Sequence, residues 1–453
     1  MDTIAGIATP PGEGGIAVIR ISGDTAFETA SRVFRPRNPS RSILKAKGYT
    51  AVFGTAVDGP REIDEAIALV FRAPRSYTGE DEVEIQCHGG NIVPKEVFRA
   101  VLKAGASPAD RGEFTRRAFL NGRISLTEAE AVAEIVSAQS RQGEAAAYSL
   151  MKGSLYRKTQ ELKAYLVEAE ADISASIEFP DEVSDADPEE LKGLVSRALD
   201  GLSSLLSKYD TGQAVMRGIP VVIAGSPNVG KSTILNLITG TDRAIVSPAA
   251  GTTRDIIEAS VDCGGLTLIL SDTAGIRDTD DYAEAEGVRR ALDRIGSSAL
   301  LIAVFDGSRK LGSGDRKLME AAAGIPSIAI INKDDLPLET DIEEISGKFR
   351  QVIRISALEE SSRDTIVNAV RQAVGADQIS GDSALLISER QRKAAMKAEK
   401  ACREALKAID DGVTLDAVHV ILEDAISSLA ELSGENVTEE VLDDVFSRFC
   451  VGK

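Results

Sequence analysis

Short runs in which apolar and polar residues alternate dominate the first part of the chain. The runs cover residues 15–21, 50–57, 66–71 and 83–87. Alternation with a period of two is typical of half-buried strands, and the later spacing of Val97, Val101 and Leu102 is typical of a helix that packs on them. Residues 1–118 are therefore predicted to form an α+β domain.

Helical spacing of apolar residues follows in two separated segments. The first begins at Thr127–Glu130, which matches a capping box, and the second begins after Gly381, at a capping box formed by Ser388–Gln391. Between these segments strand-like and helix-like runs alternate, which is the pattern of an α/β domain. We predict a multidomain chain of α+β, all-α and α/β parts. The parts are residues 1–118, a discontinuous helical domain made of 119–213 and 376–453, and an inserted domain at 214–375.

The balance of charge limits what the chain as a whole can bind. Its 453 residues are 43% hydrophobic and carry a net charge of −19, whereas residues 1–118 alone carry +1. So acidic a surface repels polyanions, and any nucleic acid must be contacted locally. Four dispersed cysteines and two histidines do not fit a disulfide scaffold or a zinc module. Without a secretion signal or a long apolar run, we expect a cytoplasmic protein with no membrane partner.

A phosphate-binding loop opens the inserted domain. The apolar run 219–224 leads directly into Gly225–Ser232, which has the pattern G-x-x-x-x-G-K-S, and a helical run follows from Thr233. The glycines let backbone N–H groups curl around phosphates at the N-terminus of a helix. Lys231 is then expected to reach the β- and γ-phosphate oxygens, and Ser232 to offer its hydroxyl to Mg²⁺.

Three further motifs follow in the order typical of GTP-binding domains. Each of the motifs 272–275, 332–335 and 356–358 comes directly after an apolar strand-like run. Asp335 can accept hydrogen bonds from N1–H and the exocyclic amine of guanine, a pair of donors that adenine lacks. The sequence therefore predicts a Ras-like GTP-binding domain. Its predicted nucleotide contacts are Asn228, Val229, Gly230, Lys231, Ser232, Thr233, Ser247, Thr252, Thr253, Asp272, Thr273, Ala274, Gly275, Asn332, Lys333, Asp335, Ser356, Ala357 and Leu358.

Hydrolysis of the nucleotide cannot follow the Ras pattern in every respect. Ras orients water with a glutamine directly after the glycine that ends the motif corresponding to 272–275. This chain has Ile276 after that glycine, and isoleucine cannot hydrogen-bond water. Asn228, in the phosphate-binding loop, has a side-chain carbonyl that can hold a monovalent cation beside the phosphates. Two threonines, Thr252 and Thr253, lie in a switch-like loop and can contact metal and phosphate.

The whole chain resembles the MnmE (TrmE) family of tRNA-modification GTPases. Many GTPases share the central motifs, and the two ends of the chain single out this family. The matching stretches are Thr3–Gly12 with Gly14 and Gly15, Arg20–Gly23, Tyr77–Asp81, His88–Gly90, Arg111–Thr115, Arg117–Asn121, Gly251–Asp255, Asp272–Arg277 and Phe449–Lys453.

The resemblance implies a cytoplasmic homodimer that is joined through the N-terminal domain. It implies that this domain binds 5-formyl-tetrahydrofolate or a related reduced folate, with contacts at Arg20, Glu80, Arg123 and Lys453. It further implies work with the flavoprotein MnmG (GidA), which carries FAD, on carbon 5 of the wobble uridine of certain tRNAs. Cys450, in the C-terminal motif, is a candidate for a role in that chemistry, although a lone cysteine beside a phenylalanine is often an ordinary packed residue.

The resemblance also assigns the ions and the water of the GTPase site. It places Mg²⁺ at Ser232 and Thr253, and gives the task of activating water to Glu284. Glu286 lies only two residues further on, so the choice between the two glutamates depends on register. Potassium is placed at Asn228, Ser247, Ala249 and Thr252.

Other functions stay open on the sequence. A ribosome-assembly GTPase of the Era type shares the apolar residue after the switch glycine, but the segment after Gly375 has no G-x-x-G loop of the kind that an RNA-binding KH module uses. A folate-dependent one-carbon transferase with a regulatory GTPase is a second alternative. A dimeric switch that performs no tRNA chemistry itself is a third.

Overall fold

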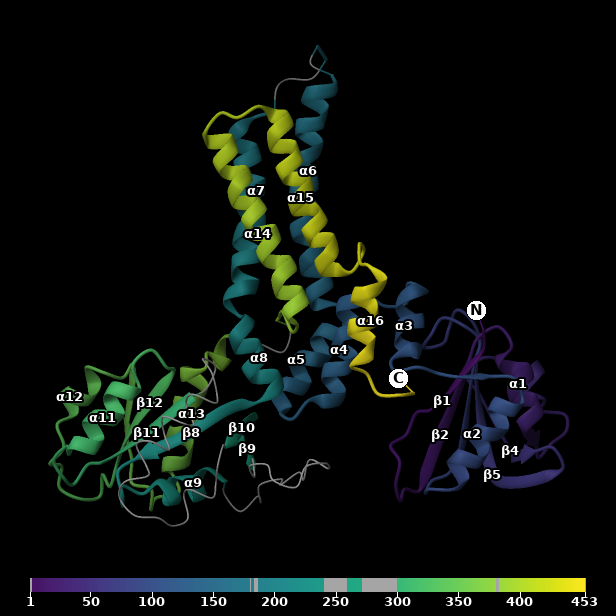
Figure 1. Cartoon of the computed structure of the whole chain (residues 1–453), viewed down its shortest axis with the longest axis horizontal. Helices are drawn as coiled ribbons and strands as arrows, with labels where there is room; N and C mark the ends of the chain where they lie inside the picture. The colour runs from purple at the N-terminus through teal and green to yellow at the C-terminus, as the bar shows by residue number, and fades with distance from the viewer. Residues whose placement is uncertain are drawn as a thin grey trace. The chain divides into compact units, whose positions relative to one another are not determined.

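A computed structural model describes residues 2–179, 181–182, 186–239, 259–270, 300–379 and 383–452 of the chain. Helices and sheets are both abundant, as Figure 1 shows. Contacts divide the chain into two compact units, Met1–Ala133 with Ala430–Lys453, and Glu134–Leu429. In the part of the chain that is described, no helix has the length and apolar character needed to cross a membrane.

The first unit is built on a seven-stranded sheet. The strand order is β3-β4-β5-β6-β2-β1-β7, and every pair is antiparallel except β1 with β7. Helices α1 (Ala26–Val33) and α2 (Val93–Lys103) pack on one face, where alternate strand residues such as Ile19, Ile21 and Ile85 are fully buried. The strands are β1 (Ile4–Ile7), β2 (Ile16–Ser22), β3 (Phe34–Pro36), β4 (Thr50–Asp58), β5 (Arg61–Phe71), β6 (Glu82–His88) and β7 (Ser107–Pro108).

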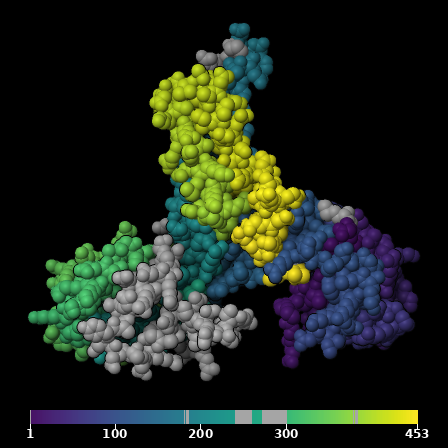
Figure 2. Space-filling model, viewed as in Figure 1, coloured from purple at the N-terminus to yellow at the C-terminus, as the bar shows by residue number. Residues whose placement is uncertain are grey.

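The C-terminal segment of the chain belongs to this same unit. Helix α16 (Glu439–Ser447) packs on α3 (Glu113–Leu120), and the yellow C-terminal atoms lie against the blue ones in Figure 2. Val451 then forms a bridge with Arg111. Gly452 has φ +91°, and a Cβ there would lie 2.3 Å from the carbonyl oxygen of Ile7. Only glycine therefore fits where the tail crosses the first strand.

The helical part of the second unit is an antiparallel bundle. Helix α14 packs on α7, which packs on α6. Alanines such as Ala394, Ala398 and Ala405 form the buried face of α14, and these small side chains let it approach α7 closely. The helices are α5 (Arg141–Met151), α6 (Ser154–Glu178), α7 (Pro188–Ser207), α8 (Tyr209–Arg217) and α14 (Glu389–Asp410), while α4 (Leu126–Ser137) and α15 (Leu415–Ser433) each span a boundary between the units.

One capping box lies two residues before its predicted place. Helix α4 begins at Leu126, so Thr127 is inside the helix and is buried. The cap is Ser125, whose hydroxyl accepts from the N–H of Glu128, while the Glu128 carboxylate accepts from the N–H of Ser125. Ser125 and Thr127 are each followed three residues later by a glutamate, so each matches the pattern of a capping box. Because Thr127 is buried within the helix, Ser125 forms the cap. The Ser388 cap is confirmed, because its hydroxyl accepts from the N–H of Gln391.

The α/β part of the second unit has a six-stranded sheet in the order β13-β12-β11-β8-β10-β9. All neighbours are parallel except β10 with β9. The central strand β11 is buried along its whole length, as expected of a parallel strand covered on both faces. The elements are β8 (Ile219–Gly225), α9 (Lys231–Thr239), β9 (Ala259–Cys263), β10 (Leu266–Leu270), β11 (Leu300–Asp306), α11 (Ser313–Ala321), β12 (Ser327–Asn332), α12 (Ile342–Ser346), β13 (Gln351–Arg354) and α13 (Ser362–Ala373).

Candidate functional site

The phosphate-binding loop connects the carboxyl end of β8 to the start of α9. Asn228 has φ +61° and Gly230 has φ +100°, so the backbone turns through left-handed conformations that glycine adopts without strain. A Cβ on Gly230 would lie 2.2 Å from Nδ2 of Asn332. The ammonium of Lys231 donates to the carbonyl oxygens of Gly225 at 2.7 Å and Ser226 at 3.1 Å, and so lies within the loop. Ser232 follows in the first turn of α9 and is exposed.

The side chain of Asn332 joins three of the predicted motifs. It is 3% exposed, its Nδ2 donates to the carbonyl oxygen of Val229 at 2.8 Å, and its Oδ1 accepts from the N–H of Ala357 at 2.9 Å. The amide therefore connects the phosphate-binding loop to the loops after β12 and β13. Parallel strands end at one edge of the sheet, which is where ligands of open α/β sheets bind.

Residues around Asn332 form the wall of the predicted base site. Lys333 has φ +68°, and its ammonium pairs with Asp306 at 2.6 Å, where it lowers the pKa of that carboxyl against the opposing effect of burial. Asp335 is exposed, and Leu358 is 82% exposed. Asp334, the other acid of the motif, is committed to an ion pair with Arg354. Both carboxylates face solvent, and Asp334 is the one held in an ion pair.

Several predicted site residues lie outside the described residues, and so does Ile276. They are Ser247, Ala249, Thr252, Thr253, Asp272, Thr273, Ala274, Gly275, Glu284 and Lys453. Those that the structure brings together at the carboxyl edge of the sheet are Asn228, Val229, Gly230, Lys231, Ser232, Thr233, Asn332, Lys333, Asp335, Ser356, Ala357 and Leu358.

A second polar cluster lies in the first unit, on the sheet face that α1 and α2 do not cover. Arg20 of β2 stands directly opposite Glu84 of β6, and its guanidinium donates to that carboxylate at 2.7 and 3.0 Å. Oε1 of Glu82 lies 3.3 Å from Nε of the same guanidinium. The rings of Tyr77 and Phe114 have their centroids 5.3 and 5.5 Å from the Arg20 guanidinium carbon. A cation is thereby held between two carboxylates and two aromatic faces.

Glu82 is the most perturbed group in this Arg20 cluster. It is 2% exposed, and its Oε2 has no hydrogen-bond partner among the described residues. Burial raises the pKa of Glu82 to about 7, because Arg20 offsets the loss of hydration only in part and Glu84 adds repulsion. A buried carboxylate oxygen without a partner is an acceptor that a ligand can satisfy.

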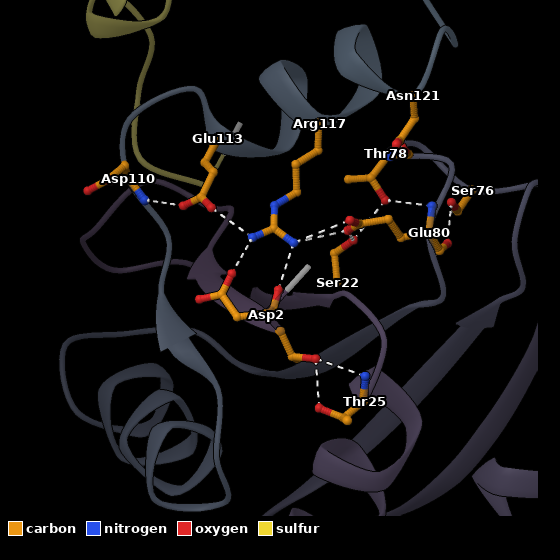
Figure 3. Close-up of polar contacts among 11 residues, drawn as sticks. Asp2, Ser22, Thr25, Ser76, Thr78, Glu80, Asp110, Glu113, Arg117 and Asn121 are labelled. Carbon is orange, nitrogen blue, oxygen red and sulfur yellow. Dashed lines mark hydrogen bonds and ion pairs between the residues drawn. The ribbon is translucent and has the colours of Figure 1, made fainter.

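Glu80, for which the family resemblance implies a folate contact, pairs with a different set of side chains from those around Arg20. Its carboxylate accepts from the hydroxyl of Ser22 at 2.7 Å and pairs with Arg117 at 3.3 Å. Figure 3 shows Arg117 at the centre, where it also contacts Glu113 and the backbone oxygen of Asp2. This network fastens α3 to Asp2, ahead of β1, and through Glu80 to Ser22 at the end of β2. In the described structure the carboxylates that contact Arg20 are Glu82 and Glu84.

The remaining predicted contacts lie close to the same domain surface. The side chain of Arg123 is exposed and packs against the loop that carries Tyr77, since a Cβ on Gly79 would lie 3.2 Å from Cγ of Arg123. Cys450 is exposed, and its carbonyl oxygen accepts from the N–H of Gly112, two residues before Phe114. Sequence reasoning missed Tyr77, Glu82, Glu84 and Phe114 as members of the cluster, although the spacing of the two glutamates in a strand places them on one face.

Comparisons with known proteins cover the chain from end to end. A family model described as the MnmE helical domain matches residues 126–450, and one described as the GTP-binding protein TrmE N-terminus matches residues 3–123. The chain is 38% identical to the tRNA modification GTPase MnmE of Clostridioides difficile over 456 residues. It is 40% identical to proteins of the same name from Moorella thermoacetica and Symbiobacterium thermophilum, over 466 and 457 residues. Each match covers 100% of this chain and 99% of the relative.

The pKa of Glu82 predicts a pH-dependent gain in stability for Glu82→Gln. Between about pH 4.5 and 7 the folded state keeps a proton that the unfolded chain has lost, so the parent loses stability as pH rises through this window. At pH 8 the variant should be more stable by about 2–3 kcal/mol, and the gain should vanish near pH 4.5. Thermal unfolding across this range measures it, with exposed Glu62→Gln as the control. A gain that does not change with pH would contradict the assignment.

Proposed function

Because the chain belongs to the MnmE family of tRNA modification GTPases and is therefore a GTP hydrolase that acts in tRNA modification, we propose a division of labour among its parts. Residues 214–375 bind and hydrolyse GTP. Residues 1–118 bind a reduced folate and join two copies of the chain. The helical parts, 119–213 and 376–453, connect them, and the second carries Cys450. The observation that carries the proposal is the Asn332 amide, which joins the phosphate loop to the guanine-selecting motifs.

In the proposed nucleotide site each contact is made by a named residue. Lys231 neutralises the β- and γ-phosphates, Ser232 and Thr253 hold Mg²⁺, and Asp335 selects guanine. The donor chemistry fits, since Ser232 is exposed at the N-terminus of a nine-residue helix and Lys231 lies within the loop. Backbone groups from Asn228 to Thr233 surround the phosphates, and those of Ser356 to Leu358 complete the base pocket.

Potassium supplies the positive charge that other GTPases take from an arginine. The amide oxygen of Asn228 binds it, together with oxygens of Ser247, Ala249 and Thr252. The exposed, left-handed position of Asn228 at the mouth of the loop supports this proposal, because its side chain is not used in packing. Glu284 orients the attacking water, with Glu286 as the alternative.

A reduced folate fits the Arg20 cluster by its chemistry. A pterin presents an N–H and an amino group side by side, and the partnerless oxygen of buried Glu82 is an acceptor for such donors. Arg123 and Lys453 bind the glutamyl carboxylates. Arg20 lies between the rings of Tyr77 and Phe114 and the carboxylates of Glu82 and Glu84. When bound, the folate supplies a one-carbon unit. In this proposal Glu80, which also pairs with Arg117, is a further folate contact.

The same sheet face supports a homodimer. Phe53 of β4 and Ile67 of β5 pair across the strands on this face, and they are 49% and 39% exposed. Exposed apolar residues on the uncovered face of a sheet are typical of a protein interface. We further propose that the dimer acts in the cytoplasm, where tRNA is found, with the FAD-containing flavoprotein MnmG (GidA). Together they modify carbon 5 of the wobble uridine.

Asp335→Asn should weaken GTP binding by about 2–4 kcal/mol, because it turns an amide donor toward a donor edge of guanine. Xanthosine triphosphate, which presents an acceptor there, should then bind better than GTP. Asp334→Asn is the matched control, since that acid pairs with Arg354, and it should keep the affinity of the parent. Titration calorimetry with both nucleotides measures this change in nucleotide preference. Parental GTP affinity in Asp335→Asn would refute the assignment of the base contact.

GTP hydrolysis should be faster in K⁺ than in Na⁺ at equal ionic strength, because the larger ion suits a site built partly of carbonyl oxygens. Glu284→Ala should lower turnover on the order of 10²–10³-fold with nucleotide affinity kept. Phosphate release under saturating GTP measures both effects. Equal rates in the two salts would remove K⁺ from the mechanism, and a loss confined to Glu286→Ala would move the role to that residue.

Arg20→Gln should weaken the binding of 5-formyl-tetrahydrofolate by about 10- to 100-fold, because a charge-assisted contact and the order of the Glu82–Glu84 pair are lost together. Arg35→Gln on the same sheet is the control, since Arg35 is exposed and pairs with Glu62. Fluorescence or calorimetric titration gives the affinity, and GTP hydrolysis should be unaffected in both variants. If Arg20→Gln binds the folate as the parent does, this cluster is not the folate site.

A further inference from the structure

A hollow of about 390 Å³ lies in the helical part of the second unit, between α6, α7 and the chain at 383–384. None of its lining residues takes part in the nucleotide site or the Arg20 cluster. The side chains that carry its chemistry are Ser154, Arg157, Lys158, Glu161, Ser204 and Lys208.

The charge in this hollow is positive, in a chain whose net charge is −19. Three of its lining side chains are cationic and one is acidic, and that acid, Glu161, pairs with Lys158 at 2.9 Å. Arg157 donates through Nη1 to the carbonyl oxygen of Lys152 and keeps its other donors. Among the described residues, no carboxylate forms an ion pair with Lys208. Two positive charges therefore remain for a ligand.

The N-terminus of α6 lies at the same hollow, which its first residue, Ser154, lines. This helix has 25 residues, and Gly153 at its N-cap has no side chain to accept from the first N–H groups. Ser154 follows; it is 8% exposed, and its hydroxyl oxygen has no hydrogen-bond partner in the described structure. A buried hydroxyl of this kind is rare unless something else satisfies it.

Packing alone explains only part of this arrangement. Arg157, in the first turn of α6, donates to the carbonyl oxygen of Lys152 at the C-terminal end of α5, and Lys208 is the C-cap of α7. At both helix ends a cation offsets the partial negative charge of the helix. That explanation accounts for two cations and leaves the Ser154 hydroxyl and the uncapped helix start without a role. An oxyanion satisfies all of them at once, because it accepts from hydroxyl, backbone N–H and cationic donors together.

We propose that this hollow is a binding site for a phosphate group. The group is held by Ser154 and the first N–H groups of α6 on one side, and by Arg157 and Lys208 on the other. The volume admits a phosphate with an attached sugar, so the source is either the backbone of the tRNA substrate or a free phosphate. A tRNA approaching so acidic a chain needs local cationic sites of this kind.

Thermal unfolding of the full chain tests phosphate binding. The protein is saturated with GDP and Mg²⁺, so that the P-loop is occupied, and potassium phosphate is compared with potassium chloride at equal ionic strength. Phosphate also stabilises proteins by exclusion from their surface, so the measured quantity is the difference between parent and variant. Lys208→Gln and Arg157→Gln should lose most of the phosphate-dependent rise in Tm. Lys400→Gln, on α14 and outside the hollow, should keep it.

Ser154→Ala separates ligand binding from folding. Its hydroxyl makes no hydrogen bond in the described structure, so the variant should unfold at or above the parental Tm in chloride. It should nevertheless respond less to phosphate than the parent does. Ser176→Ala, on the same helix, removes a hydroxyl that donates to the carbonyl oxygen of Asp172, and it should keep the parental response.

A second experiment, which measures tRNA binding, identifies the source of the phosphate. Binding is measured over a range of salt concentrations, and Lys208→Gln should weaken it about three- to tenfold and reduce the slope of log K against log salt by about one. Such a loss assigns the site to the tRNA backbone. Unchanged tRNA binding with a lost response to phosphate assigns it to a free phosphate. If parent and Lys208→Gln respond equally to phosphate and bind tRNA equally, the proposal is wrong.

Discussion

The nucleotide-binding half of this protein depends on one buried amide. Asn332 donates to the phosphate loop and accepts from the loop after β13, so three segments that lie far apart in sequence share a single hydrogen-bonding group. Its position is fixed because β12 ends there, between β11 and β13, in a sheet that is buried on both faces. Gly230 has no side chain for the same reason, since a Cβ would collide with this amide. The geometry of the phosphate site and that of the base site therefore cannot vary independently.

In the N-terminal unit the corresponding constraint is the pairing of β2 with β6. Antiparallel register sets Arg20 opposite Glu84, and the two-residue period adds Glu82 on the same face. Burial of Glu82 raises its pKa to about 7, because the single cation Arg20 offsets the loss of hydration only in part and the neighbouring Glu84 adds repulsion. Such an imbalance costs folding energy, and it is typical of a binding surface.

Much of the fold was predictable because its signals are local. The strands at 266–270 and 327–331, the Ser388 cap and the loop at 225–232 follow from neighbouring residues alone, and the structure confirms them. Family matches at both ends favour a tRNA modification GTPase over the ribosome-assembly alternative. One error concerns a choice between similar neighbours: Ser125 is the cap in place of Thr127, which is buried inside the helix. The pairing of Arg20 with Glu84 and Glu82 depends on strand register, which neighbouring residues alone do not reveal.

Docking of the tail on the first strands has a consequence for synthesis of the protein. Arg116 and Glu439 form an ion pair across 323 residues of sequence, and Gly452 lies on Ile7 in the same unit. At ribosomal rates of about 5–20 residues per second, the N-terminal sheet waits on the order of 15–65 s for its partner segment. Throughout that interval the surface around Gly112, which Phe446 and Phe449 later contact, is exposed in the nascent chain. Maturation of this domain therefore follows synthesis of residues 439–449, long after that of its strands.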